Sequence, residues 1–166
     1  MPELTVGVIG VGHFGTALIK GMLSHSNQVQ ILITERDSPK LIADEYHHRI
    51  SGSSIRGIGD IESLKKKSDV VILCVRPQDM DEVMENLIDY DGLIISFAAG
   101  LPISYYEDRK PDIKLIRAMS NLAIEYGKGV NGWVTNRNCK ISDESSYHKI
   151  FNNLAYSFHY KIAQES

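Results

Sequence analysis

The chain has 166 residues, a length that predicts one domain with room for a sizeable core. Its 43% apolar and 23% charged residues are ordinary for a soluble globular protein, and a net charge of −3 argues against a nucleic-acid partner. Two widely separated cysteines exclude a disulfide framework, and no apolar run approaches the roughly 18 residues of a membrane span. We therefore expect a cytoplasmic protein without a metal or a membrane partner.

The beginning of the chain contains a glycine-rich turn between a predicted strand and a predicted helix. A β-branched run at residues 6–9 indicates a buried strand, and an apolar helical pattern continues to residue 23. Between them lie Gly10, Gly12 and Gly15. In a dinucleotide site the first glycine makes the tight turn, the second lets the backbone approach the pyrophosphate, and the third lets helix and strand pack closely. An ordinary glycine-rich turn is the alternative interpretation.

A second strand at residues 29–34 supports the dinucleotide site. It is followed by Glu35, 20 residues beyond Gly15, where a ribose-binding acid is expected. Pro39 suits the first turn of a helix, with Ser38 as its N-cap.

The rest of the chain alternates strands and helices, which predicts a doubly wound parallel sheet. Helices are expected at residues 39–48, 60–67, 79–88, 102–107 and 143–156, and further strands near residue 55 and at residues 69–75, 92–96, 113–117, 128–135 and 157–162. The connection between Ile116 and Val130 is too short for a full helix. We therefore expect a single-domain α/β, Rossmann-like, mostly parallel sheet with an antiparallel C-terminal edge.

Several side chains are expected to be structural. Cys74 reads as a buried thiol, Trp133 as core, and Lys65 to Lys67 as the solvated end of a helix. Five aromatic residues near the end of the chain fit either the core or a contact face: Tyr147, Phe151, Tyr156, Phe158 and Tyr160.

Four motifs at the predicted strand ends carry a resemblance to a known family. They are the stretch from Gly12 to Leu23, Arg76-Pro77-Gln78 after a buried strand, Ile-Ser-Phe-Ala-Ala-Gly ending at Gly100, and Ile-Arg-Ala-Met-Ser-Asn ending at Asn121. From residue 4 to residue 162 the chain resembles the N-terminal NAD(P)-binding domain of the pyrroline-5-carboxylate reductase family. The resemblance implies an oxidoreductase of proline biosynthesis that transfers hydride from NADPH or NADH to a cyclic imine without a metal, and it makes residues 1–166 one NAD(P)-binding Rossmann domain.

The resemblance also implies residue roles. Ser120 and Asn121 are the candidate catalytic residues, beside the nicotinamide and the substrate. The cofactor-binding candidates around the pyrophosphate, the ribose path and the nicotinamide are Gly10, Gly12, His13, Phe14, Gly15, Val75, Arg76, Pro77, Ala98, Ala99 and Gly100. A structural role is favoured for Arg117, and Ser96 fits a strand-end cap equally well as a site residue.

Two interpretations of the cofactor stay open. Glu35 favours NAD, because a carboxylate accepts hydrogen bonds from a ribose 2′-hydroxyl and repels a 2′-phosphate. Arg36 and Ser38 favour NADP, because they can hold that phosphate. The resemblance to the family tips the expectation to NADP.

The chain departs from the family in two ways. The family's Met-Pro-Asn-Thr-Pro is replaced by Met-Ser-Asn-Leu-Ala at residues 119–123, which removes rigid backbone angles and a hydroxyl. The family's C-terminal helical dimerisation domain is expected to be absent, so a homo-oligomer or a separate helical domain would complete the site, and activity of this chain alone is in doubt. The alternatives are a non-catalytic dinucleotide-binding or sensor module and a deazaflavin-dependent NADP reductase-like protein.

Overall fold

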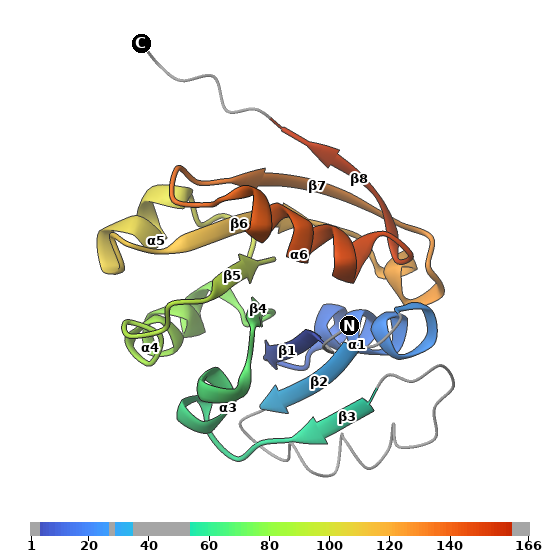
Figure 1. Ribbon diagram of the computed structural model, residues 1–166, viewed down its shortest axis with the longest axis horizontal. Helices are drawn as coiled ribbons and strands as arrows, with labels where there is room; N and C mark the ends of the chain where they lie inside the picture. Colours follow the sequence, from blue (N-terminus) through green and yellow to red (C-terminus); the bar gives the residue numbers. More distant parts are fainter. Residues whose placement is uncertain (1–3, 27–28, 35–53, 161–166) are drawn as a thin grey trace.

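The computed structural model describes residues 4–26, 29–34 and 54–160, and eight strands of these residues form one sheet (Figure 1). Their order across the sheet is β3-β2-β1-β4-β5-β6-β7-β8. The strands are β1 (Leu4–Ile9), β2 (Val29–Thr34), β3 (Ser54–Gly57), β4 (Val70–Leu73), β5 (Leu93–Ser96), β6 (Lys114–Met119), β7 (Gly129–Thr135) and β8 (Ala155–His159).

Strands β1 to β6 are parallel to one another, whereas β7 is antiparallel to β6 and β8 is parallel to β7. The doubly wound sheet with a reversed C-terminal edge is therefore confirmed. The reversed edge consists of two strands, β7 and β8, that run the same way as each other.

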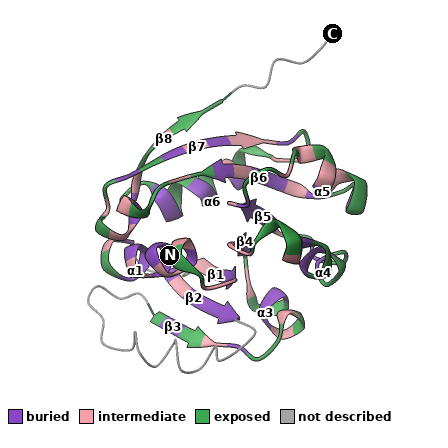
Figure 2. Cartoon of the chain, turned by 180° about the vertical axis from the view of Figure 1, so that it is seen from behind, coloured by how far each residue is buried: buried purple, intermediate pink, exposed green. Residues whose placement is uncertain are grey.

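The helices cover the two faces of the sheet (Figure 1). They are α1 (His13–His25), α3 (Ile61–Lys67), α4 (Met80–Glu85), α5 (Ile103–Arg109) and α6 (Ile141–Phe151), with 3-10 helices η1 (Pro77–Asp79) and η2 (Leu122–Tyr126). One apolar cluster joins the sheet to α1, η2 and α6, and a second joins it to α3, α4 and α5. The central strands form apolar runs because helices cover both of their faces. Figure 2 shows this contrast between the buried central strands and the exposed strand β8.

Several element boundaries differ from the predicted ones. Helix α4 ends at Glu85, because the side-chain amide of Asn86 donates to the carbonyl of Glu82. Helix α6 begins at Ile141, because the carboxylate of Asp143 accepts the backbone N–H of Lys140. The chain turns after α6, so β8 starts earlier than predicted. The helix predicted at residues 39–48 lies outside the described residues. The helices in the described part of the chain are each too short or too polar to span a membrane.

The side chain of Lys65 is buried rather than solvated, which corrects the sequence-based expectation. Its exposed fraction is only 7%. The Nζ atom donates to the backbone carbonyl of Asn86 at 2.8 Å and forms ion pairs with Asp89 and Glu62. These partners satisfy the buried ammonium group, which would otherwise be costly to remove from water. Lys65 therefore fastens α3 to the segment that follows α4.

Helix α1 lies against η2 at Gly21. A Cβ atom at this position would overlap the backbone carbonyl oxygen of Ile124. Because the overlap is with backbone, a small rotation of a side chain cannot relieve it. The close approach of the two helices therefore requires glycine at position 21.

Gly21→Ala is expected to lower the free energy of unfolding by about 1–3 kcal/mol, because overpacking outweighs the better helix propensity of alanine. Urea denaturation followed by circular dichroism measures the change. Gly59→Ala is the matched control, because a Cβ atom at Gly59 meets no heavy atom within 4 Å. Equal stability of the two variants would show that the contact between α1 and η2 relaxes freely.

Candidate functional site

All four segments predicted to form the site lie at the carboxyl edge of the parallel strands, and backbone hydrogen bonds join the ends of β1, β4 and β5 there. The backbone N–H of Gly10 donates to the carbonyl of Thr34 at the end of β2, at 3.2 Å. The N–H of Cys74 donates to Ile9 at 2.8 Å, and that of Phe97 donates to Leu73 at 3.0 Å. Each bond ties the residue after one strand to the end of its neighbour. In open α/β sheets, this edge is where ligands bind.

The turn after β1 is closely packed. Gly10 has φ +93°, and a Cβ atom there would lie 2.8 Å from the side chain of Val75 and 2.9 Å from the backbone of Cys74. A Cβ atom on Gly15 would overlap the carbonyl oxygen of Gly10. The turn therefore has the conformation and the close helix–strand contact that the glycine pattern predicts.

Gly12 has a different environment. It precedes the first residue of α1, it is exposed, and a Cβ atom on it would meet no heavy atom within 4 Å. The first N–H groups of a helix have no partner within the helix, and they lie at the positive end of its dipole. The first turn of α1 contains no acidic residue, and His13 is exposed there. This open helix start fits an anionic group.

Phe14, in the first turn of α1, makes an aromatic contact. Its ring centroid lies 4.7 Å from that of Phe97, which lies 5.7 Å from that of Phe151 in α6. Both Phe14 and Phe97 are half-buried. The start of α1, the end of β5 and α6 are therefore held together by three rings.

The segments after β4 and β5 present small or exposed residues. Val75 is half-buried and Arg76 is exposed, with its Nε 3.2 Å from the carboxylate of Asp79, and Pro77 begins η1. After β5, Ala98 is buried, whereas Ala99 and Gly100 are exposed. Gly100 has φ +77°, a conformation that favours glycine.

Ser96 caps the end of β5, in agreement with one of its two predicted roles. Its Oγ accepts the N–H of Ala98 at 3.3 Å and lies 2.6 Å from the hydroxyl of Tyr106. Arg117 in β6 donates from Nη2 to the carbonyl of Ala98 at 2.8 Å. The segment after β5 is therefore held from its own strand and from the neighbouring one.

The two candidate catalytic residues follow β6. The Oγ atom of Ser120 is buried and has no hydrogen-bond partner among the described residues. Asn121 is exposed and precedes η2, and its side chain makes no capping bond. Ser120 and Asn121 thus lie at the same edge as the glycine turn.

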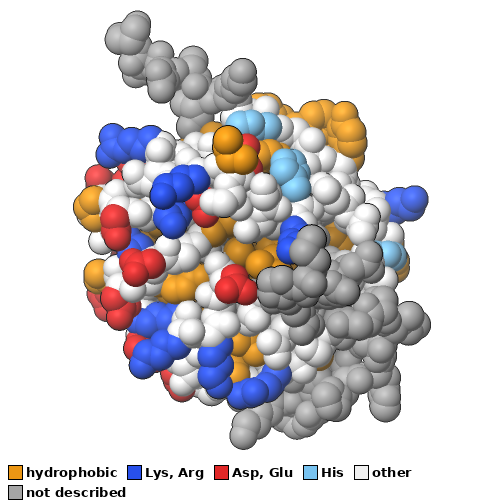
Figure 3. Space-filling view, viewed as in Figure 1, with side chains coloured by type: hydrophobic (Ala, Val, Ile, Leu, Met, Phe, Trp, Pro, Cys, Tyr) orange, Lys and Arg blue, Asp and Glu red, His pale blue; other side chains and the backbone are white. Residues whose placement is uncertain are grey.

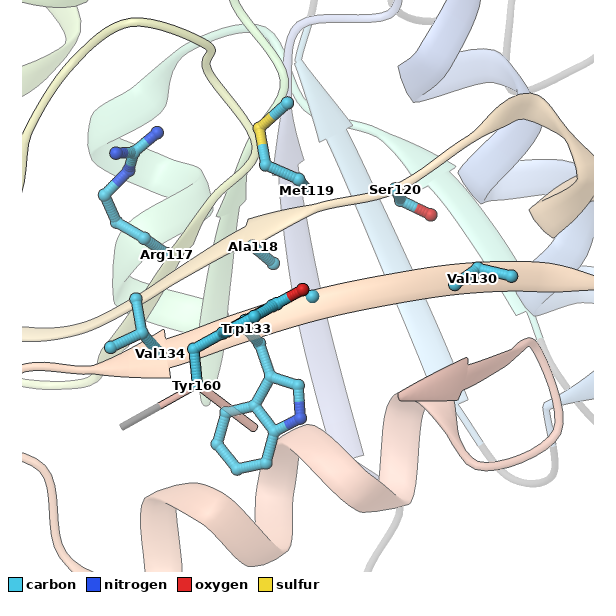
Figure 4. Close-up of a pocket in the computed structure, with 9 residues that line it drawn as sticks. Arg117, Ala118, Met119, Ser120, Val130, Trp133, Val134 and Tyr160 are labelled. Atoms are coloured by element: carbon cyan, nitrogen blue, oxygen red, sulfur yellow. The ribbon is translucent and has the colours of Figure 1, made fainter. Parts of the chain in front are cut away.

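A pocket of about 450 Å³ lies on the face of β6 and β7 next to Ser120 (Figure 4). Its lining residues are Arg117, Ala118, Met119, Ser120, Val130, Gly132, Trp133, Val134 and Tyr160. Of these, only Ser120 is a site residue predicted from the sequence. The available signal was the alternation along residues 130–134, but it identifies a pocket only once the antiparallel pairing of β7 with β6 is known.

Neither cysteine is an activated nucleophile. Burial raises the pKa of the Cys74 thiol to about 12, and burial is also the main reason why the pKa of Cys139 is about 12. Both thiols are therefore neutral near pH 7. The sequence predicts a strand at residues 69–75 that includes Cys74, but Cys74 lies just after the end of β4. Among the described residues, no three histidine, cysteine or acidic side chains are grouped to hold a metal.

The surface over α3 and α4 carries lysine, arginine and acidic side chains interspersed (Figure 3). Such mixed charge does not form a basic patch of the kind that binds nucleic acid. Glu35, Arg36 and Ser38, which bear on the choice between NAD and NADP, lie outside the described residues. Their roles stay predictions.

Comparison with known proteins places these features in a family. Residues 5–100 match the family described as NADP oxidoreductase coenzyme F420-dependent. The chain is 28% identical over 148 residues to the pyrroline-5-carboxylate reductase of Aquifex aeolicus, covering 89% of this chain and 54% of the relative. It is 29% identical over 156 residues to that of Methanosarcina acetivorans, covering 91% of this chain and 56% of the relative. The resemblance found in the sequence is thus confirmed, and the chain spans about half the length of these curated relatives.

Solved structures share the fold. The 1-pyrroline-5-carboxylate reductase of Streptococcus pyogenes matches with a TM-score of 0.81 and 22% identity, over 99% of this chain and 60% of that one. The pyrroline carboxylate reductase of Plasmodium falciparum, solved with NADP bound, matches with a TM-score of 0.76 and 21% identity, over 97% of this chain and 59% of that one.

Both thiols are expected to react slowly with iodoacetamide in the folded protein at pH 8, because a thiol with a pKa near 12 contains little thiolate at that pH. Mass spectrometry at timed intervals, with and without guanidinium chloride, measures the labelling. Unfolding should restore ordinary thiol pKa values and accelerate labelling at both positions. Rapid labelling of the folded chain would contradict the burial of these thiols.

Proposed function

Because the chain belongs to the family described as NADP oxidoreductase coenzyme F420-dependent, we propose that it is the cofactor-binding domain of an NAD(P)H-dependent reductase of the pyrroline-5-carboxylate reductase type. The observation that carries the proposal is the open helix start at Gly12, at the same carboxyl edge of the sheet as the ends of β4, β5 and β6. Similarity to reductases of that name over about nine tenths of the chain supports the substrate class.

The glycine turn fits the pyrophosphate of a dinucleotide. Gly12 leaves space for the phosphate oxygens to reach the backbone, since nothing lies within 4 Å of its missing Cβ. The N–H groups and dipole at the start of α1 favour the negative charge. Gly10 and Gly15 hold this geometry, while Val75, Arg76 and Pro77 border the path that leads from the turn towards β5.

The end of β5 fits the nicotinamide. Ala98, Ala99 and Gly100 carry at most a methyl group, so a flat ring can approach their backbone. When bound, the nicotinamide supplies the hydride that reduces the imine. Ser120, whose hydroxyl has no partner among the described residues, and Asn121, with an exposed amide, are the residues that orient the substrate beside it.

The pocket next to Ser120 is open to one side, and the segment at residues 119–123 lacks the prolines of the family's pattern. Hydride transfer depends on fixed orientation and on exclusion of water. We therefore expect cofactor binding without efficient turnover by this chain alone. A second copy or a separate helical domain would supply the missing walls.

NADPH is the proposed cofactor, with NADH as the alternative. The family description and the guanidinium of Arg36 with the hydroxyl of Ser38 favour a 2′-phosphate. Glu35 favours the free 2′-hydroxyl of NADH.

A second candidate function is that of a deazaflavin-dependent NADP reductase. The description of the matched family, which names coenzyme F420, favours it specifically. A non-catalytic dinucleotide-binding or sensor module is the third candidate.

Calorimetric titration with NADPH and with NADH tests the cofactor proposal. Gly12→Ala is expected to weaken binding at least tenfold, because the methyl group occupies the space of the pyrophosphate, and to leave the urea midpoint unchanged, because it meets nothing in the free protein. Gly59→Ala is the control and should bind like the original chain. Failure of the original chain to bind either cofactor would exclude the proposed site.

Absorbance at 340 nm with pyrroline-5-carboxylate distinguishes the three candidates. Binding with slow or no oxidation of NADPH is expected, and addition of a helical domain from a relative should raise the rate if the missing walls limit it. Reduction of coenzyme F420 by NADPH would support the second candidate. Binding with no turnover of either substrate, even with the helical domain present, would favour a sensor.

A further inference from the structure

We propose that Arg117 is a positioning residue that fixes residues 97–100 in the conformation that receives the nicotinamide end of the cofactor. The inference rests on the proposed function and deepens it. Arg117 lies in the neighbouring strand β6 and holds the segment that follows β5. The sequence alone predicts only a structural role for this arginine.

The position of Arg117 in the sheet is the first argument. Arg117 is paired with Ser96, the last residue of β5, in the parallel register. Its Nη2 atom reaches past this pair and donates to the carbonyl of Ala98 at 2.8 Å. The side chain thus continues the attachment between the two strands for two residues beyond the end of β5.

Hydrogen bonds hold Ala98 on both sides. Its N–H donates to Ser96 Oγ at 3.3 Å, and its carbonyl accepts from Arg117. The two bonds fix the peptide planes before and after Ala98, and the second of these planes leads into the exposed residues 99 and 100. Loss of the Arg117 bond would release the plane that faces the proposed nicotinamide.

The conformation of Arg117 has an energetic cost. The Nε atom of Arg117 is buried and has no hydrogen-bond partner among the described residues. A buried unpaired donor is unfavourable and calls for an explanation. An arginine with only a general structural task would gain by turning this donor to solvent. Its conformation is instead the one that places Nη2 on Ala98.

The chain offers three informative variants. Arg117→Met keeps the length and apolar contacts but removes the donor. Arg117→Lys keeps one charged donor, which suffices because a single bond to Ala98 is at stake. Arg137→Met is the matched control, because Arg137 is also an arginine but is exposed. It follows β7, and the N–H of the preceding residue Asn136 donates to the carbonyl of Leu115 near the start of β6, away from the carboxyl edge.

The experiment compares binding of NADPH with binding of 2′-phospho-ADP-ribose, which lacks the nicotinamide (NADH and ADP-ribose are used if NADH binds more tightly). Arg117→Met is expected to weaken the binding of NADPH at least tenfold and to change the affinity for 2′-phospho-ADP-ribose less than twofold. It should also lower the fluorescence emission of bound NADPH. Arg117→Lys should restore most of the NADPH affinity, and Arg137→Met should resemble the original chain.

Hydrogen exchange without ligand provides a second readout. In Arg117→Met the amide of Ala98, which donates to Ser96 Oγ, should exchange faster, whereas the amides of β4 should not. If Arg117→Met leaves both the exchange rate and the NADPH affinity unchanged, the positioning role is wrong. It is also wrong if the variant lowers the affinities for NADPH and 2′-phospho-ADP-ribose equally. Failure of the original chain to bind either ligand would overturn the proposed function and this inference together, whereas normal binding of both ligands by Arg117→Met would overturn the inference alone.

Discussion

The close contact between Gly10 and Gly15 is the constraint on which the carboxyl edge depends. The carbonyl of Gly10 occupies the space in which any other residue at position 15 would place its Cβ atom. The same turn lies against Val75 and Cys74, so the end of β4 is fixed relative to the end of β1. Phe14, in the first turn of α1, packs against Phe97 after β5 and so fixes the end of that strand as well. Local steric requirements in one turn thus set the positions of three strand ends.

Aromatic residues at the reversed edge of the sheet differ in how far they are buried. On one face Trp133 lies between Tyr147 and His159, with ring centroids 4.5 and 4.2 Å away, and only 3% of Trp133 is exposed. The five aromatic residues for which the sequence predicts either a core or a contact-face position fall into two groups. Tyr147 and Phe151 are buried in the core, whereas Tyr156, Phe158 and Tyr160 are exposed in the described structure. The expectation that Trp133 belongs to the core is confirmed.

Most of the fold could be predicted because its signals are local. Runs such as residues 70–73 are buried on both faces and so are apolar throughout. The glycine turn is equally local, since its spacing follows from the geometry of a strand that enters a helix. The burial of Lys65 could not be predicted, because its partners Asn86 and Asp89 come from a distant segment. The pocket next to Ser120 likewise depends on the register between β6 and β7, which no single stretch of sequence specifies.

The contact between Gly21 and Ile124 has a consequence for the order of events in folding. The pairing of β1 with β4 joins Val6 to Val70, which are far apart in the sequence. The contact of α1 with η2 joins Gly21 to Ile124, which are separated by a still longer stretch of chain. Contacts between residues far apart in sequence form slowly, because the intervening chain must first be closed into a loop. During synthesis, the ribosome releases α1 long before η2 exists. The helix that carries the glycine turn is thus among the first to be made and among the last to be fully covered.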